Sequence, residues 1–98
     1  MSSTTVEGLR ALADPVRWTI TDALRPGPRC ACELVDELAI PAPLLSHHMR
    51  VLRVAGLVQA RRLGRRVEYT IDLGALDDLA RSVAGHARQL TAAEAGTR

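Results

Sequence analysis

The chain is poor in aromatic residues and has no lysine. Its 98 residues include no phenylalanine, one tryptophan and one tyrosine, so a core has to be built from leucine, valine, isoleucine and alanine. All 13 basic residues are arginines. A chain this short forms one domain and buries a limited fraction of its surface, which makes further burial through dimerisation favourable.

Three further absences limit the class of protein. No apolar run approaches membrane-spanning length, and no basic segment followed by an apolar core opens the chain. We therefore expect a cytoplasmic protein without a membrane partner, whose two cysteines are thiols and not a structural disulfide. No set of nucleophile, base and orienting group occurs, and Gly64 and Gly74 are isolated turn residues, so an enzyme is not indicated.

Positive charge is concentrated in the middle third of the chain. Residues 41–71 contain six arginines and one acidic residue, whereas residues 1–40 contain four arginines and six acids. Residues 72–98 contain three arginines and four acids. This distribution predicts a surface that binds nucleic-acid phosphates, because neutralising them releases counterions. The alternative is a solvated face that uses arginine in place of lysine.

Residues 42–55 have the pattern of a helix with two different faces. Leu45, Met49 and Leu52 share one apolar stripe. Pro43 lies in the first turn and Gly56 follows the last one, as is typical of helix ends. The opposite face carries Ser46, His47, Arg50 and Arg53.

A shorter helix precedes this one and is separated from it by only three residues. Residues 33–38 place Leu34, Val35 and Leu38 on one face, and residues 39–41 form the connection. Such a short connection makes the two helices cross steeply, which leaves the second helix able to enter a major groove. The pattern predicts a helix-turn-helix over residues 30–55.

An alternating pattern over residues 58–71 predicts a β-hairpin, or wing, that follows this helix. With Leu63 and Gly64 as the turn, Ala60 is expected opposite Val67 and Val58 opposite Tyr69. One face then packs inward. The exposed side and tip carry Arg61, Arg62, Arg65 and Arg66.

The remaining segments complete a mainly α fold with a small β-hairpin, of the α+β class. We expect one domain over residues 1–98 with about five helices and a two-stranded wing at 57–71. The second helix is expected from Asp14 and Pro15 to near Arg25. Helices 5–13 and 73–94 are expected to form a dimer interface, although their apolar positions also fit an intradomain core. In the last helix these positions are Leu73, Leu76, Leu79, Ala80, Val83, Ala87 and Leu90.

Four segments in this order carry a family resemblance. They are Leu12-Ala13-Asp14-Pro15-Val16-Arg17, Cys30-Ala31-Cys32-Glu33-Leu34, Leu45-Ser46-His47-His48-Met49-Arg50-Val51-Leu52 and Ala55-Gly56-Leu57-Val58. Over residues 6 to about 90 the chain resembles the ArsR/SmtB winged helix-turn-helix repressors of bacteria. The resemblance implies a homodimeric transcriptional repressor that binds double-stranded operator DNA and releases it when an effector arrives.

The helix-turn-helix and the wing supply the expected DNA contacts. Leu44 is placed to touch a thymine methyl, but the family often has Gln or Thr at positions 42–44, so shape readout is expected to contribute. His48 is expected to pack inside the domain. The expected DNA-binding residues are Ala42, Pro43, Leu44, Ser46, His47, Arg50, Arg53, Arg61, Arg62, Arg65 and Arg66.

Cys30 and Cys32 are the main candidates for sensing an effector. They stand at a helix N-terminus, which favours the thiolate, and soft thiolates bind arsenite, cadmium, lead or zinc. The family's arsenic sensors carry a third cysteine where this chain has Val35. The pair also fits two buried apolar residues or a thiol-oxidation switch. A direct bond between them is not expected, because side chains two residues apart in a helix diverge.

His86 is a weaker metal candidate on the last helix. The family's second metal location uses paired donors, and here Gln89 replaces the ligand three residues on. A metal or metalloid-responsive repressor is therefore one hypothesis. One alternative is a DNA-binding repressor with no metal site of its own, which is constitutive or controlled by a regulatory partner protein. The other is a winged-helix protein-interaction module that binds a protein and not DNA.

Overall fold

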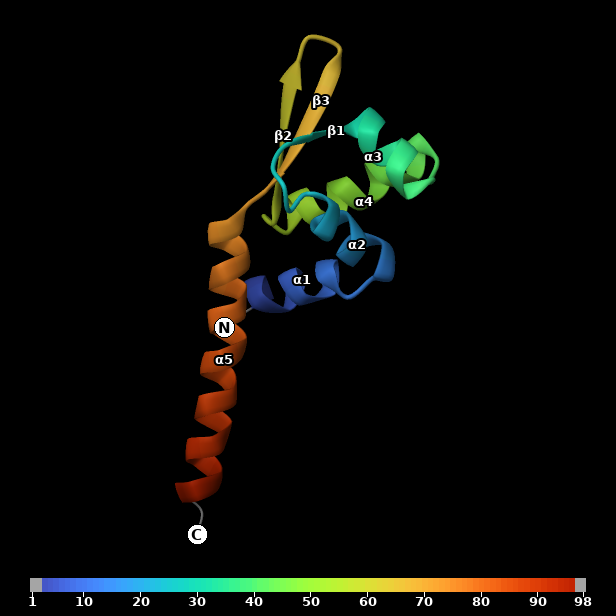
Figure 1. The fold of residues 1–98 in the computed structure, drawn as a ribbon. Helices are drawn as coiled ribbons and strands as arrows, with labels where there is room; N and C mark the ends of the chain where they lie inside the picture. Colours follow the sequence, from blue (N-terminus) through green and yellow to red (C-terminus); the bar gives the residue numbers. More distant parts are fainter. Residues whose placement is uncertain (1–2, 97–98) are drawn as a thin grey trace.

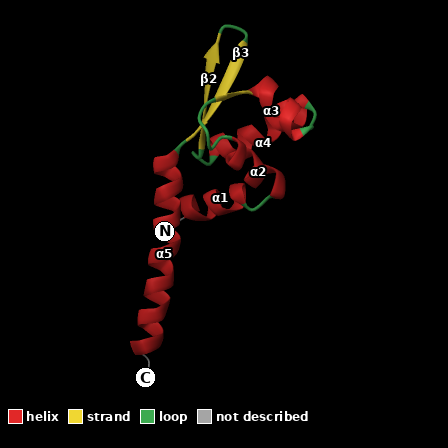
Figure 2. Ribbon diagram, viewed as in Figure 1, coloured by secondary structure: helices red, strands yellow, loops and turns green. Residues whose placement is uncertain are grey.

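Helices make up most of the chain, and a small sheet stands at one end of them (Figures 1 and 2). The computed structural model describes residues 3–96. The five helices and three strands of that range are α1 (Ser3–Leu12), α2 (Pro15–Ala23), β1 (Arg29–Cys30), α3 (Ala31–Leu38), α4 (Ala42–Val54), β2 (Val58–Leu63), β3 (Arg66–Ile71) and α5 (Leu73–Gly96). The expected winged helix-turn-helix is confirmed.

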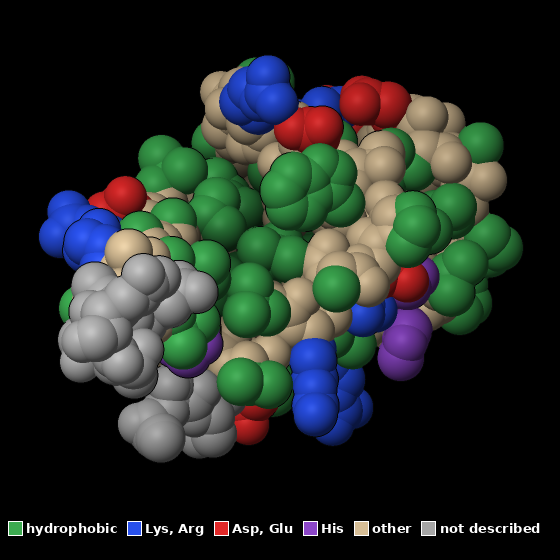
Figure 3. All heavy atoms as spheres, turned by 90° about the horizontal axis from the view of Figure 1, so that it is seen from below, with side chains coloured by type: hydrophobic (Ala, Val, Ile, Leu, Met, Phe, Trp, Pro, Cys, Tyr) green, Lys and Arg blue, Asp and Glu red, His purple; other side chains and the backbone are tan. Residues whose placement is uncertain are grey.

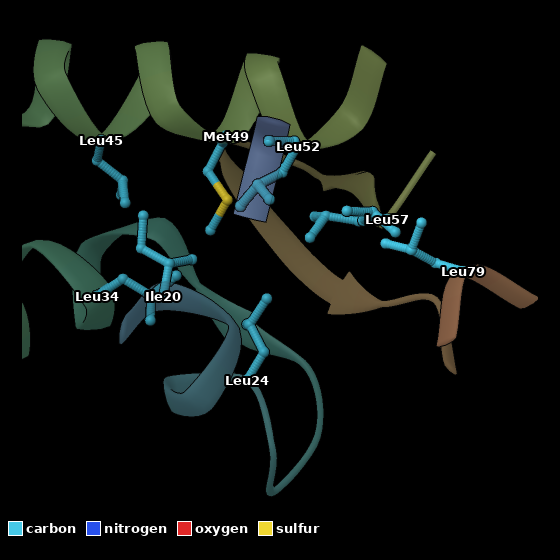
Figure 4. Packing of buried hydrophobic residues seen from close by; sticks show 10 residues of the cluster. Ile20, Leu24, Leu34, Leu45, Met49, Leu52, Leu57 and Leu79 are labelled. Atoms are coloured by element: carbon cyan, nitrogen blue, oxygen red, sulfur yellow. The ribbon is translucent and has the colours of Figure 1, made fainter. Parts of the chain in front are cut away.

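The core lies under α4 and is built without aromatic side chains (Figure 4). Leu45, Met49 and Leu52 of α4 are almost fully buried, as predicted from their spacing. They belong to one cluster with Ile20 and Leu24 of α2, and with Leu34 of α3 and Leu57, which follows α4. Burying this stripe fixes which face of α4 is left for solvent.

Local capping explains where the helices begin and end. Asp14 caps α2, since its Oδ2 accepts a hydrogen bond from the Arg17 amide at 3.0 Å, and Pro15 takes the first helical position. α2 ends at Ala23, two residues before the predicted end. The α3–α4 connection turns at Ala39, whose φ of 54° places it in the left-handed region.

The wing forms as expected, but its predicted register is wrong. Ala60 lies opposite Tyr69 and Val58 opposite Ile71, so the pairing is displaced by two residues. Gly64 has a φ of +63° and is the first residue of the two-residue loop, not the second. A turn moved by one residue moves the register by two, and the alternation of faces survives.

The sheet has a third strand that the sequence pattern did not predict. β1 pairs with β3 antiparallel, with Arg29 opposite Tyr69 and Cys30 opposite Glu68, and the strand order is β1-β3-β2. Two residues are too short to show an alternating pattern. Arg29 holds β1 to α3, because its Nη2 donates to Glu37 Oε1 at 2.7 Å.

α5 leaves the rest of the molecule after its first turns (Figure 1). Asp72 alone separates it from β3, and the Asp72 Oδ1 accepts a hydrogen bond from the Ala75 amide at 3.0 Å. Gln59 Nε2 of β2 donates to Asp72 Oδ2, also at 3.0 Å. Among the described side chains of α5, Leu79 is the buried one, so only the first part of the predicted apolar stripe packs within the domain.

Candidate nucleic-acid interface

The exposed face of α4 carries the residues expected to contact DNA. All seven α4 residues predicted to contact DNA are solvent-exposed. Leu45, His48, Met49 and Leu52 on the other face are buried. α4 therefore presents a polar and basic face while its apolar face is held by the core. The exposed residues are Ala42, Pro43, Leu44, Ser46, His47, Arg50 and Arg53.

The wing begins beside the end of this helix and adds four exposed arginines. β2 begins four residues after α4 ends, and the Leu57 amide donates to the Leu52 carbonyl at 3.0 Å, which fixes the start of the wing to the helix end. The hairpin then projects beyond the helices (Figure 1). The exposed side chains are Arg61, Arg62, Arg65 and Arg66.

A partly buried polar cluster connects α4 to the first two helices. Arg17 Nη1 lies 3.1 Å from His48 Nδ1, and Arg17 Nε donates to the Ala11 carbonyl at 2.6 Å. The guanidinium can only donate, so Nδ1 of His48 accepts and is unprotonated in this contact. The Asp14 carboxylate lies 4.0 Å from the same nitrogen. The prediction that His48 packs inside the domain is confirmed.

Burial lowers the pKa of His48, because the imidazolium would lose hydration there. Nearby Asp14 acts in the opposite direction, whereas the Arg17 and His47 charges lower the pKa further. His48 is therefore neutral at physiological pH. The backbone hydrogen bond from Arg17 lowers the pKa of Asp14.

Arg17 is a residue whose role the sequence reasoning missed. It positions the back of α4 and carries no periodic signal, since its partners lie in α1 and α4. The one available signal was local: an arginine follows three residues after a capping aspartate in the segment that carried the family resemblance.

The structure overturns the expectation that Cys30 and Cys32 are separate thiols. The two residues are joined as a disulfide. Cys30 precedes α3 and has extended backbone angles, with φ −69° and ψ 142°, so the divergence of helical side chains does not apply to it. The Cys32 amide donates to Cys30 Sγ at 3.3 Å, and the Cys30 amide donates to Glu33 Oε1 at 2.9 Å.

The two sulfurs fit only part of a metal site. After reduction they would offer two thiolates from one short segment. No group of three or more His, Cys, Asp or Glu side chains suited to a metal ion occurs in the described part of the chain. His86 is exposed on α5, in the part of that helix that extends past Leu79.

An apolar surface runs over α1 and α5. Val6 is 47% exposed and Leu90 58% exposed, and Leu9 and Val83 are also exposed. A hollow of about 730 Å³ lies between the two helices, lined in part by Val6, Leu9, Val83 and His86. Seen from below, hydrophobic side chains cover much of the visible face, and most charged groups lie toward its margins (Figure 3). Among residues 3–96, no helix has the length and apolar composition needed to cross a bilayer.

The His48 contact predicts a stability that depends on pH. Because the folded-state pKa of His48 is below its ordinary value of 6.5, the unfolded chain binds more protons as the pH falls through that value. The free energy of unfolding should therefore decrease as the pH falls below about 6.5. His48→Gln should remove part of this decrease. At pH 7 it should lower the free energy of unfolding by about 1–2 kcal/mol, because Arg17 loses the well-placed acceptor Nδ1 of His48.

Urea unfolding measured by circular dichroism between pH 5 and pH 8 tests this expectation. The exposed His47→Gln variant is the matched control and should retain most of the wild-type decrease, because burial of His48, and not the His47 charge, is the main cause of its lowered pKa. An unchanged pH dependence in His48→Gln would show that the buried imidazole is not its source.

Comparisons with known proteins agree with this geometry. Residues 14–60 match a sequence model described as a bacterial regulatory protein of the arsR family. The chain is 51% identical over 65 residues to the HTH-type transcriptional repressor SmtB of Mycobacterium tuberculosis, covering 66% of this chain and 48% of that protein. It thus spans about half the length of that relative.

Other relatives are covered more fully. The arsenical resistance operon repressor of Staphylococcus aureus is 38% identical over 71 residues, which cover 72% of this chain and 68% of that protein. An ArsR-like transcriptional regulator from Rhodococcus sp. RHA1 has a similar structure, with a TM-score of 0.79 and 26% identity over 94% of this chain and 91% of that one. The matched segments are those that build α2, α3, α4 and the start of the wing, and the chain belongs to the arsR family of bacterial regulatory proteins.

Proposed function

We propose that this chain is a transcriptional repressor that binds double-stranded operator DNA with sequence specificity, and not an enzyme. The observation that carries the proposal is the exposed face of α4, fixed next to a wing with four exposed arginines. Named relatives support it, since they are repressors. Such a protein acts where bacterial DNA is, in the cytoplasm.

The two elements have different proposed roles at the DNA. The start of α4 enters the major groove, where Ser46 and His47 can hydrogen-bond to bases or phosphates and Leu44 can contact a thymine methyl. Ala42 and Pro43 lie close to the base edges. Phosphate and minor-groove contacts fall to Arg50, Arg53, Arg61, Arg62, Arg65 and Arg66.

The proposed domain organisation is a single winged helix-turn-helix domain that acts as a homodimer. Val6 and Leu9 of α1 and Val83 and Leu90 of α5 are exposed along one apolar surface. All four side chains stay exposed in the single chain. A second copy that covers them would bury apolar area and place two α4 helices on one operator.

The proposed effector is a thiophilic metal or metalloid ion that binds at Cys30 and Cys32. Thiolates are soft donors, and the staphylococcal relative is named an arsenical resistance operon repressor. The disulfide must first be reduced. Two small-molecule thiols supply the two electrons, give two cysteine thiols and leave as their own disulfide. A third donor must come from outside the Cys30–Cys32 segment.

A second candidate follows from the disulfide itself. In the joined state neither sulfur is available as a ligand, and the chain would then bind DNA without a metal site of its own. Its signal would come from a regulatory partner protein, or it would repress constitutively. The experiment with ions below separates these two candidates.

Removing wing arginines should weaken DNA binding in a salt-dependent way. Arg65→Ala and Arg66→Ala should each reduce the slope of log K against log salt concentration by about one unit per lost phosphate contact. Fluorescence anisotropy with a promoter duplex at several salt concentrations measures the slope. Arg81→Ala, a change on exposed α5 outside the α4 and wing surface, is the control. A wild-type chain that binds no duplex would instead indicate a protein-interaction module.

Charge on the apolar surface should dissociate the dimer. Val83→Glu and Leu90→Glu should raise the dimer dissociation constant by about tenfold or more, since each buried side chain of this size contributes roughly 1.5–3 kcal/mol. Sedimentation velocity over a range of concentrations measures it. Leu63→Glu, at an exposed leucine of the wing, should leave association unchanged. Equal effects at all three positions would argue against an α5 interface.

A thiophilic ion should release the reduced protein from DNA. Arsenite, cadmium, zinc, nickel and cobalt are added in turn to the reduced protein–duplex complex, and anisotropy follows dissociation. We expect a decrease of about 5–150-fold in DNA affinity with arsenite or cadmium. The Cys30→Ser/Cys32→Ser variant should bind the duplex and ignore these ions. Tight binding that no ion changes would favour the partner-controlled or constitutive repressor.

A further inference from the structure

A second hollow lies between α1 and α4, on the side of α4 that holds proposed DNA contacts. Its volume is about 560 Å³, within the usual range for pockets that bind small molecules. Its lining has a basic part and an apolar part. We call the basic side chains of Arg10, His47 and Arg50 the rim, and the apolar side chains of Ala11, Val51 and Val54 the floor.

The rim side chains have no acidic partner among the side chains that the structure describes. Arg10, His47 and Arg50 are exposed, and none of them forms an ion pair there. Arg17 lines the same hollow, but its guanidinium is already held by His48 and the Ala11 carbonyl. Glu7 is the single acid in the lining. The hollow therefore carries net positive charge that an anion would neutralise.

The floor distinguishes this hollow from a simple phosphate contact. Val54 is 76% exposed, and Val51 is half-buried beside it. A phosphodiester has no apolar surface with which to cover these side chains. An organic anion with an apolar body would neutralise the rim and remove the valine surface from water at the same time.

We propose that the α1–α4 hollow binds a small organic anion with an apolar body, and that this ligand and DNA exclude each other. The exclusion rests on the proposed function, because Arg50 and His47 are assigned to DNA as well as to the hollow. Binding of the anion itself does not depend on that function. The hollow contains no cysteine, so this site is separate from Cys30 and Cys32.

Two matched probes test the binding. 8-Anilinonaphthalene-1-sulfonate has an anionic group and apolar rings, and N-phenyl-1-naphthylamine has the rings without the charge. Fluorescence titration should show that Arg10→Gln weakens the sulfonate at least fivefold and changes the neutral probe less than twofold. Val54→Asp should weaken both probes. Arg81→Gln, on exposed α5, should change neither.

The second step adds DNA. Promoter duplex should displace the sulfonate from wild-type protein, and the sulfonate should lower duplex affinity in return. If Arg10→Gln leaves sulfonate affinity unchanged, the proposal is wrong. Arg10→Gln could instead lower the salt dependence of duplex binding and leave sulfonate affinity unchanged. The hollow would then bind the DNA backbone, and the proposal would also be wrong. A failure of wild type to bind duplex would refute the proposed function and the exclusion, while the sulfonate titration would still decide the site.

Discussion

The burial of one stripe of α4 is the constraint on which the rest of the structure depends. Leu45, Met49 and Leu52 pack against α2 and α3, and this packing determines which side of the helix solvent and ligands can reach. The core is aliphatic, so its side chains hold α4 in place only through the fit of their shapes. The hydrogen bonds of Arg17 add a directional contact at the back of α4 that aliphatic packing does not provide.

α4 therefore contributes to three surfaces. Its buried stripe holds the domain together, its exposed face carries the proposed DNA contacts, and its side toward α1 lines the basic hollow. His47 and Arg50 belong to the last two. Sharing side chains between two anionic partners is a simple way to make their binding competitive, and it requires no second conformation.

Local signals in the sequence predicted most helix boundaries and the exposed face of α4, because capping by Asp14 and Pro15 and the apolar spacing of α4 act within a few residues. The failures have non-local or backbone causes. The register of the wing depended on which loop residue takes a positive φ, and β1 depended on pairing with distant β3. The Cys30–Cys32 bond depended on the extended backbone of Cys30. The hollow between α1 and α4 exists only after tertiary packing.

Asp72 connects the wing directly to α5, so a rotation of α5 is expected to move the wing with it. It is the single residue between β3 and α5, and its carboxylate holds both Gln59 and the Ala75 amide. A six-residue strand is roughly 20 Å long, so a tilt of about 10° at α5 would move the wing tip by about 3.5 Å. That displacement equals about one base-pair step. In a dimer joined through α5, the angle between the two α5 helices would therefore determine the spacing of the operator half-sites that both wings can contact at once.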